Sequence, residues 1–324
     1  MPQEHYYGGQ AVLEGVMMRG RDVWAVAVRR PDASIHLESH RIESIAERWP
    51  ILRKPGLRGI IALGQALRIG VKALTISANQ SVEEEEKLTP RQMAVSMVVA
   101  FTIFIAVFIV GPTVLFRYAQ RQVPSGILLN AAEGVFRVLL FLGYLWLIGR
   151  MREIRRVFEY HGAEHKTIAA YEHGEELDPE RVDQFSTLHV RCGTNFLLIV
   201  MVLTIFVFAF FGTPTLPWRI ASRIVAIPII AGLAFEALRL GARYSTSTVM
   251  RALMAPGLWL QKITTQPPSL TQIEVAIASF NEVLRREREV GAGGPAASPA
   301  PPVAEAAAEP AAGPIEPERP DGPA

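Results

Sequence analysis

The sequence predicts a mainly α-helical, polytopic membrane protein with about four transmembrane helices, a small N-terminal antiparallel β element and peripheral amphipathic helices. Half of the 324 residues are hydrophobic and the mean hydropathy lies above zero, which favours a membrane protein. Four apolar stretches reach or approach the roughly 20 residues that a helix needs to cross a bilayer. Strand-like and amphipathic patterns lie on either side of these stretches.

Composition also excludes several classes. A net charge of +2 argues against a nucleic-acid binder, which would carry a basic face. Cys192 is the single cysteine, so neither an intramolecular disulfide nor an all-cysteine zinc site can form. The first residues, Met1–His5, lack the basic and apolar segments of a cleaved signal, so we expect the internal apolar segments to direct insertion.

The N-terminal region, 1–50, has the pattern of strands. Turn-forming residues at Pro31–Ser34 separate two strand-like runs, Trp24–Arg30 and Ile35–Ser39. The preceding Gly8–Val16 offers a further strand. We therefore expect a small antiparallel sheet here.

The next region, 51–92, combines a helix with an acidic linker. Between Leu57 and Leu74, apolar residues recur at helical spacing. Basic residues interrupt this pattern: Arg58, Arg68 and Lys72. The pattern predicts an amphipathic helix on the membrane surface or, equally, a helix that packs on the core of a soluble domain. Glu83–Glu86 then reads as a solvated linker.

Two pairs of membrane helices are expected, within 93–149 and 194–242. The four apolar stretches are Met93–Leu115, Ile127–Ile148, Phe196–Phe211 and Ile220–Leu240. The second contains Glu133 and Arg137, and the fourth contains Arg223, Pro228 and Glu236. Because of these interruptions, the last pair either spans the bilayer or forms a hairpin or re-entrant element.

The distribution of basic residues predicts the orientation. Four arginines follow the second stretch closely: Arg150, Arg152, Arg155 and Arg156. Because lysine and arginine accumulate in cytoplasmic loops, we expect the loop 150–193 and both termini on the cytoplasmic side of a bacterial inner membrane. The lipid bilayer is then the first partner of the chain.

The C-terminal region, 243–290, predicts interfacial and cytoplasmic helices. Pro256–Leu260 includes a tryptophan of the kind that lies among headgroups. Ser269 and Gln272 form a capping box that opens a helix. The tail, 291–324, is rich in alanine, proline, glycine and glutamate, so we expect it to be disordered.

One motif in the predicted cytoplasmic loop suggests chemistry. His161 and His165 are four residues apart, so on a helix both imidazoles reach one metal ion. With Glu164 they form H-x-x-E-H, the inverted zincin order, in which the glutamate is the general base to water activated by zinc. The alternative is a juxtamembrane helix whose histidines contact headgroups or backbone.

A metal site needs a third ligand. Glu172 lies about 16 Å along a straight helix from His161, too far to share an ion. We rank His189 first, because it precedes the third span on the same side of the membrane. Glu236 comes second, as an ionisable group inside a span. Cys192 comes third; a helix N-terminus favours its thiolate, although a small packing role is equally expected.

Several motifs together resemble the YqhQ-like membrane proteins, a family of unknown function. They are Gly8–Arg19, His161–Thr167, Ala170–Glu172, Arg191–Thr194 and Pro256–Thr265. The resemblance implies a bacterial membrane protein, and some members carry the label of predicted metal-dependent enzyme. The family pattern has proline and serine where this chain has Val190 and Asn195, which leaves His189 and Cys192 in place.

Two functional hypotheses follow. The first is a zinc-dependent hydrolase with Glu164 as base, acting at the cytoplasmic membrane surface on a lipid or peptide. The second is a non-catalytic scaffold or assembly factor, whose sheet and peripheral helices bind a protein partner. Transport is disfavoured because no paired, interrupted half-spans are visible.

Overall fold

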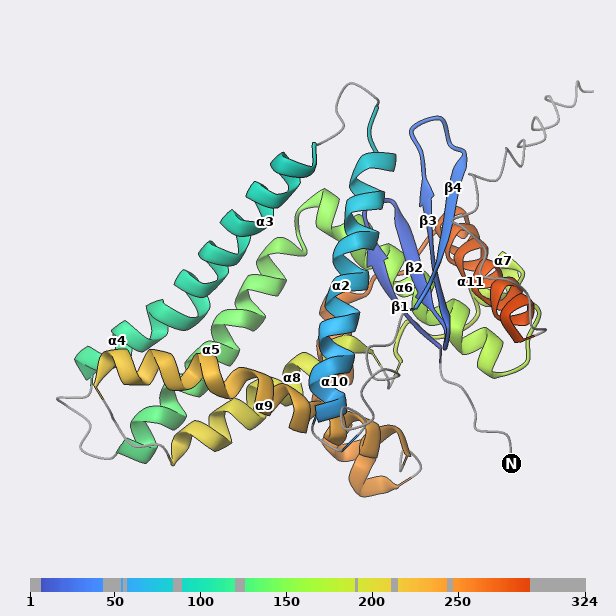
Figure 1. Ribbon diagram of the computed structural model, residues 1–324. Coiled ribbons are helices and arrows are strands. Elements are labelled where there is room, and N and C mark those ends of the chain that lie inside the picture. Colours follow the sequence, from blue (N-terminus) through green and yellow to red (C-terminus); the bar gives the residue numbers. More distant parts are fainter. Residues whose placement is uncertain are drawn as a thin grey trace, which may run out of the picture.

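The computed structural model describes residues 7–42, 54, 57–83, 89–119, 126–189, 192–210, 215–243 and 247–291. Figure 1 shows long helices reaching to one side, a four-stranded sheet on the other, and α2 and α10 between them. The predicted acidic linker lies mostly outside the described residues, as does the tail from 292 onward.

The sheet is an antiparallel meander in the order β1-β2-β3-β4. Its strands are Gly8–Val12, Gly15–Arg19, Val23–Arg29 and Ile35–Arg41. The predicted antiparallel element is thus confirmed, but the run Gly8–Val16 holds parts of two strands rather than one. Glu14 makes this turn with a φ of 50°, and its carbonyl accepts a hydrogen bond from the Arg29 N–H at 2.8 Å.

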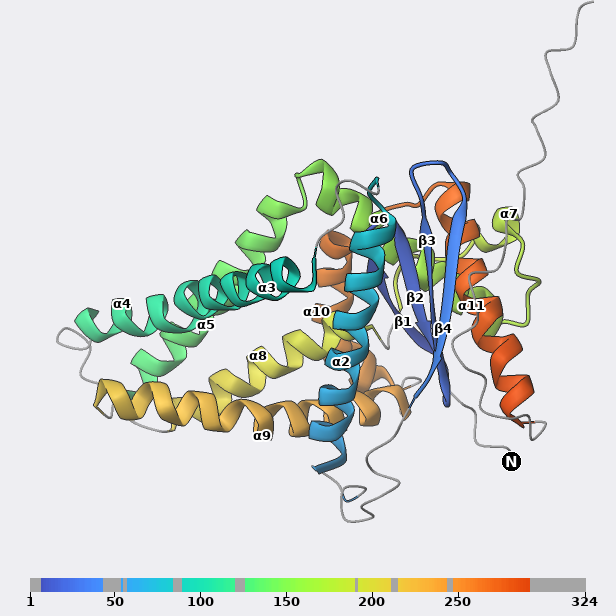
Figure 2. The same ribbon diagram turned by 45° about the horizontal axis from the view of Figure 1, so that its top comes forward.

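Both faces of the sheet are covered, which explains the continuous burial of β2 and β3. Because side chains alternate along a strand, Met18, Ala25 and Ala27 enter one apolar cluster, whereas Trp24 and Val26 enter another. Helices α6 (Arg152–Glu172) and α11 (Leu270–Gly291) cover the first face, and α2 (Leu57–Gln80) covers the second (Figures 1 and 2).

Helix α11 begins at the predicted capping box. The Ser269 N–H donates to Gln272 Oε1 at 2.8 Å, and the Gln272 N–H donates to Ser269 Oγ at 3.4 Å. Phe280, fully buried, then packs in the cluster beneath the sheet. The cap and this apolar stripe together define the helix.

Within the described residues, four helices are long and apolar enough to cross a membrane: Leu57–Gln80, Arg91–Tyr118, Gly126–Ile148 and Ile220–Leu238. The first of them belongs to α2, predicted as a surface or packing helix. Its Ile69 and Ala73 pack on the sheet, so part of this helix does pack on a core. The predicted third span, α8 (Gly193–Ala209), is a shorter apolar helix.

The described residues form further helices. They are α3 (Pro90–Ile105), the π-helix η3 (Ala106–Val110), α4 (Gly111–Ala119), α5 (Gly126–Ile148), α7 (Pro179–Val182), α9 (Leu216–Arg243) and α10 (Thr248–Thr264). Helix α9 continues through Pro228, so the fourth stretch is one long helix rather than a broken one.

One carboxylate inside the apolar stretches pairs with two arginines. Glu133 of α5 is fully buried; its Oε1 lies 2.7 Å from Arg137 Nη2 and 2.7 Å from Arg223 Nη1 of α9. Arg137 also donates to the Phe108 and Ile109 carbonyls at 3.1 and 3.2 Å, within η3, where a π-turn alters the helical hydrogen-bond pattern. This cluster ties α4, α5 and α9 together.

Candidate metal centre

The H-x-x-E-H motif lies in the middle of α6, a helix packed against both the sheet and α11. Tyr160, Ala163 and Ile168 face the apolar cluster beneath the sheet. His161 and His165, one turn apart, face away from that cluster with ring centroids 4.4 Å apart. The helix therefore presents both imidazoles on one side, as the spacing predicts.

Backbone carbonyls orient both rings. His161 Nδ1–H donates to the Thr264 carbonyl at 2.8 Å, and His165 Nδ1–H donates to the Thr187 carbonyl. Because a carbonyl only accepts, each ring must carry its proton on Nδ1, which leaves the Nε2 lone pair available. Metal-binding histidines are commonly oriented by this second hydrogen bond.

The two Nε2 atoms converge with a sulfur. His161 Nε2 lies 3.2 Å from Cys192 Sγ, and ligand atoms of His161, His165 and Cys192 all lie within 4.8 Å of one another. Ligands about 2.0–2.3 Å from a tetrahedral zinc ion are separated by roughly 3.3–3.8 Å. His165 Nε2 is buried and has no hydrogen-bond partner among the residues that the structure describes, so a polar atom is left without the interaction that burial normally requires. These donors fit zinc in type and in number for a three-ligand site, and the separation of His161 Nε2 from Cys192 Sγ is close to that range.

Cys192 stands at the N-terminus of α8, where its Sγ accepts a hydrogen bond from the Thr194 N–H at 3.4 Å. The sequence predicted that this helix end would favour the thiolate. Burial has the larger effect, however, and raises the pKa of the thiol above its ordinary value. A buried thiol beside two imidazoles becomes a thiolate readily only when a cation shares the site.

Glu164 lies on the neighbouring side of α6, under strand β1. A Cβ at Gly9 would stand 2.9 Å from the Glu164 Cδ and Cγ atoms, so only glycine leaves room for this carboxyl group. The Gly9 N–H donates to it. Burial raises the pKa of Glu164 to about 8, and His161 and the Gly9 N–H partly oppose that shift. The candidate base is therefore held by the N-terminal sheet.

Of the other two predicted ligands, His189 lies beside this cluster and Glu236 lies away from it. The His189 ring is 5.7 Å from the His165 ring, but its Nε2 lies 3.4 Å from Glu172 Oε2. Burial lowers the pKa of His189 to about 4. Glu236 pairs with Arg58 of α2, whose Nε donates to it at 2.6 Å. Cys192, ranked last of the three, is the one brought closest to both histidines.

Sequence reasoning missed the residues that hold this centre in place. Gln261, fully buried, accepts from the His189 N–H and donates to the His189 carbonyl, both at 2.8 Å, and donates to Asn195 Oδ1 at 3.2 Å. Gln261 and Thr264 stand among the motifs that carry the resemblance, which was the available signal. A backbone acceptor such as the Thr187 carbonyl leaves no such signal in the sequence.

A sheet-containing domain with a buried histidine–cysteine cluster, joined to long apolar helices, defines a membrane protein with a candidate metal centre. Comparison with known proteins places the chain more closely. It belongs to the family described as "Protein of unknown function (DUF1385)", whose sequence profile matches residues 54–286. It is 36% identical over 295 residues to the uncharacterized protein YqhQ of Bacillus subtilis strain 168, covering 87% of this chain and 93% of that protein. No solved structure matches it significantly.

Proposed function

We propose that this protein is a membrane-bound, zinc-dependent hydrolase whose metal is held by His161, His165 and Cys192. The observation that carries the proposal is the convergence of two imidazole Nε2 atoms and one sulfur, with both ring tautomers set by backbone carbonyls. Histidine and cysteine ligands together are typical of zinc. Three protein ligands leave a coordination position open, which is typical of catalytic rather than structural zinc.

Glu164 serves as the general base. Its carboxyl group is close enough to His161 and Cys192 for their charges to affect its pKa. Bound zinc supplies Lewis acidity, which lowers the pKa of water to about 7. Because burial raises the pKa of Glu164, its carboxylate form would depend on a cation bound in the site; that carboxylate would take a proton from water and later return it to the leaving group. Its burial excludes bulk water, which would otherwise compete for that proton.

The site faces the cytoplasm, and its substrate comes from the membrane surface. Arg150, Arg152, Arg155 and Arg156 lie between α5 and the motif, and all are exposed. Arg150 lies 3.8 Å from the centre of the Trp146 ring, a pairing suited to the headgroup region. A lipid or peptide at that level reaches α6 without crossing the bilayer. A green fluorescent protein fused after Gly291 should therefore fluoresce, whereas an alkaline phosphatase fused there should be inactive.

Metal content tests the proposal directly. Full-length protein purified in detergent should contain about one zinc per chain by elemental analysis. His161→Ala, His165→Ala and Cys192→Ser should each lose most of it. His173→Ala is the matched control, because His173 is exposed at the end of the same helix. Wild-type protein that folds normally and binds no zinc on titration would refute the metal centre.

A second experiment separates catalysis from structure. Glu164→Gln keeps all three ligands, so the variant should retain zinc and fold. It should nevertheless fail to complement a deletion strain in which the wild-type gene restores a growth phenotype. Complementation by Glu164→Gln would instead favour the alternative, a non-catalytic scaffold stabilised by a structural metal and recognised by a protein partner.

His189 suggests how the structural metal of that non-catalytic scaffold would be held. Its ring neighbours His165, and a small rotation would supply a fourth protein ligand. Such a closed site would be structural, since no position would remain for substrate. The contact of His189 with Glu172 at 3.4 Å favours the open, three-ligand site, in which His189 and Glu172 border the position where a substrate binds.

A further inference from the structure

A second candidate site lies on the opposite face of the sheet from the metal centre. A cavity of about 280 Å³ opens between β3, β4 and α2. Its lining residues are Trp24, His40, Arg41, Ile42, Gln65, Arg68, Ile69 and Lys72. None of them is acidic and three carry a full positive charge, so the cavity is suited to an anionic group.

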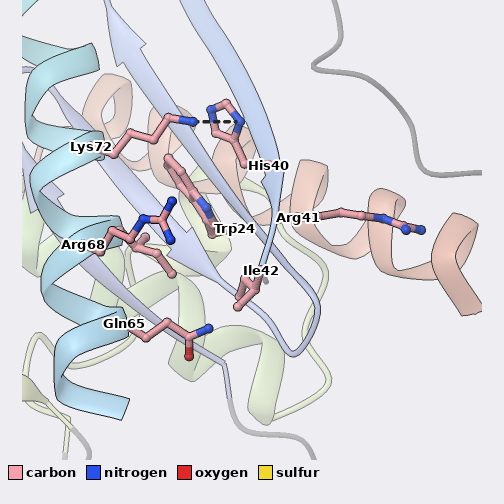
Figure 3. A pocket seen from close by; sticks show the side chains of 8 residues that line it. Trp24, His40, Arg41, Ile42, Gln65, Arg68 and Lys72 are labelled. Carbon is pink, nitrogen blue, oxygen red and sulfur yellow. Dashed lines mark hydrogen bonds between the residues drawn. The ribbon is translucent and has the colours of Figure 1, made fainter. Parts of the chain in front are cut away.

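The side chains in Figure 3 show how that charge is arranged. Arg68 and Lys72, one turn apart on α2, both extend toward the Trp24 ring, while Arg41 points away. The ammonium of Lys72 lies 5.6 Å from the centre of that ring and 3.3 Å from His40 Nδ1. Arg68 makes no ion pair among the described residues. Arg68 and Lys72 thus place two positive charges near the Trp24 ring, with little negative charge beside them to balance these.

The same part of α2 carries exposed apolar side chains. Leu67, Val71 and Leu74 are 58%, 37% and 41% exposed; Leu67, Val71 and Leu74 recur at i, i+4 and i+7, which places them on one face of the helix. A strip of exposed leucine and valine beside arginine and lysine is the pattern of a helix at a membrane interface, where apolar residues meet acyl chains and basic residues meet headgroups.

The position along α2 places the cavity near the membrane boundary. A Cβ at Gly59 would lie 3.0 Å from the Gly232 carbonyl of α9, so the start of α2 packs closely on a helix long and apolar enough to span. Ile69, about 15 Å further along the helix axis, packs against the sheet instead. The cavity therefore lies where the helices of the membrane meet the sheet.

We propose that this cavity binds the phosphate group of an anionic phospholipid, with Arg68 and Lys72 as its charged contacts. Arginine offers paired N–H donors to phosphate oxygens and lysine a point charge. Basic sites at this level of membrane proteins are suited to anionic headgroups. The cavity size accommodates a headgroup, and the exposed strip Leu67–Leu74 accommodates the chains attached to it. This site is independent of the metal centre.

Binding can be measured on the full-length protein in detergent, by native mass spectrometry during titration with phosphatidylglycerol. Diacylglycerol with the same acyl chains is the probe without phosphate. Arg68→Gln and Lys72→Gln should each weaken phosphatidylglycerol binding about fivefold, whereas Lys72→Arg should preserve it. Arg288→Gln, which removes an exposed charge from α11, is the matched control and should leave binding unchanged.

The outcomes distinguish the possible sources of phosphate. If millimolar inorganic phosphate competes with phosphatidylglycerol at the wild-type site, and this competition is lost in Arg68→Gln, the phosphate group alone suffices for binding. Absence of that competition would mean that the acyl chains are also required. The proposal is overturned if wild type binds diacylglycerol as well as phosphatidylglycerol, or if Arg68→Gln and Lys72→Gln bind phosphatidylglycerol as tightly as Arg288→Gln.

Discussion

Gly162 lies inside the motif and offers a test of how the metal centre is held. A Cβ at this position would stand 2.2 Å from the Gln266 carbonyl oxygen. Ordinary contacts begin at 3.4 Å, so Gly162→Ala must push the segment after α10 away by about 1 Å. That segment begins directly after Thr264, whose carbonyl orients His161, and it is fixed by the Gln266 N–H donating to the Phe158 carbonyl at 2.9 Å.

Whether Gly162→Ala raises or lowers the free energy of unfolding depends on two opposing contributions. Alanine is favoured over glycine inside a helix by up to about 1 kcal/mol. Overpacking against a backbone atom costs about 1–3 kcal/mol, because a carbonyl cannot rotate out of the way as a side chain can. We therefore expect Gly162→Ala to lower the free energy of unfolding by about 1–2 kcal/mol. Loss of the carbonyl that orients His161 should weaken zinc binding about tenfold or more.

Zinc affinity is measured by competition with a chromogenic chelator, and stability by denaturant unfolding in detergent. Gly143→Ala is the matched control, since a Cβ at Gly143, inside helix α5, meets nothing within 4 Å; it should leave zinc affinity unchanged and raise the free energy of unfolding by up to about 1 kcal/mol. Unchanged zinc affinity in a destabilised Gly162→Ala protein would show that the Thr264 carbonyl does not orient His161. A variant with wild-type stability would refute the close packing itself.

Three further outcomes are expected. His189→Ala should retain zinc, measured by elemental analysis; stoichiometric loss would indicate the closed structural site instead. Glu133→Gln should destabilise the membrane helices by about 3–5 kcal/mol in denaturant unfolding, because it leaves the buried Arg223 without its counter-charge; an effect no larger than that of the exposed Glu153→Gln would contradict this. The adjacent rings of His36 and then His40 hold the pKa of Glu38 below its ordinary value, so wild type should exceed Glu38→Gln in stability above about pH 4 and lose that advantage as the pH falls further; an advantage that grows on acidification would refute the assignment.

Local patterns in the sequence predicted local structure well. The capping box at Ser269, the turn before Ile35 and the helical spacing of His161 and His165 each depend on residues within a few positions of one another. Because the interactions that form each of these features lie within a short segment, the sequence alone predicts the feature. The hairpin at Glu14 was missed because a glutamate in the left-handed region carries no turn signature; the Arg29 N–H and the paired Arg156 stabilise it from elsewhere in the chain.

Long-range partners were harder to predict. Glu236 was recognised as an ionisable group inside a span and Glu133 as an interruption of another, but the sequence could not decide which arginine each one meets. The structure pairs Glu236 with Arg58, 178 residues away, and Glu133 with Arg223. The order of the candidate ligands was equally undetermined, because Cys192 and His189 are only three residues apart and either can face α6. Only the packing of α8 and α10 settles which one does.

The N-terminal sheet is best understood as one wall of the metal centre. Its first strand places Gly9 against Glu164, while its hairpin pairs Glu14 with Arg156 one turn before the motif. The proposed base is thereby oriented by a segment about 150 residues away in sequence, and the proposed metal ligands by α8 and α10. A motion of the sheet relative to those helices would therefore move Glu164 relative to the histidine–cysteine cluster. This arrangement gives a physical reason for the Gly8–Arg19 segment and the H-x-x-E-H motif to occur in the same chain.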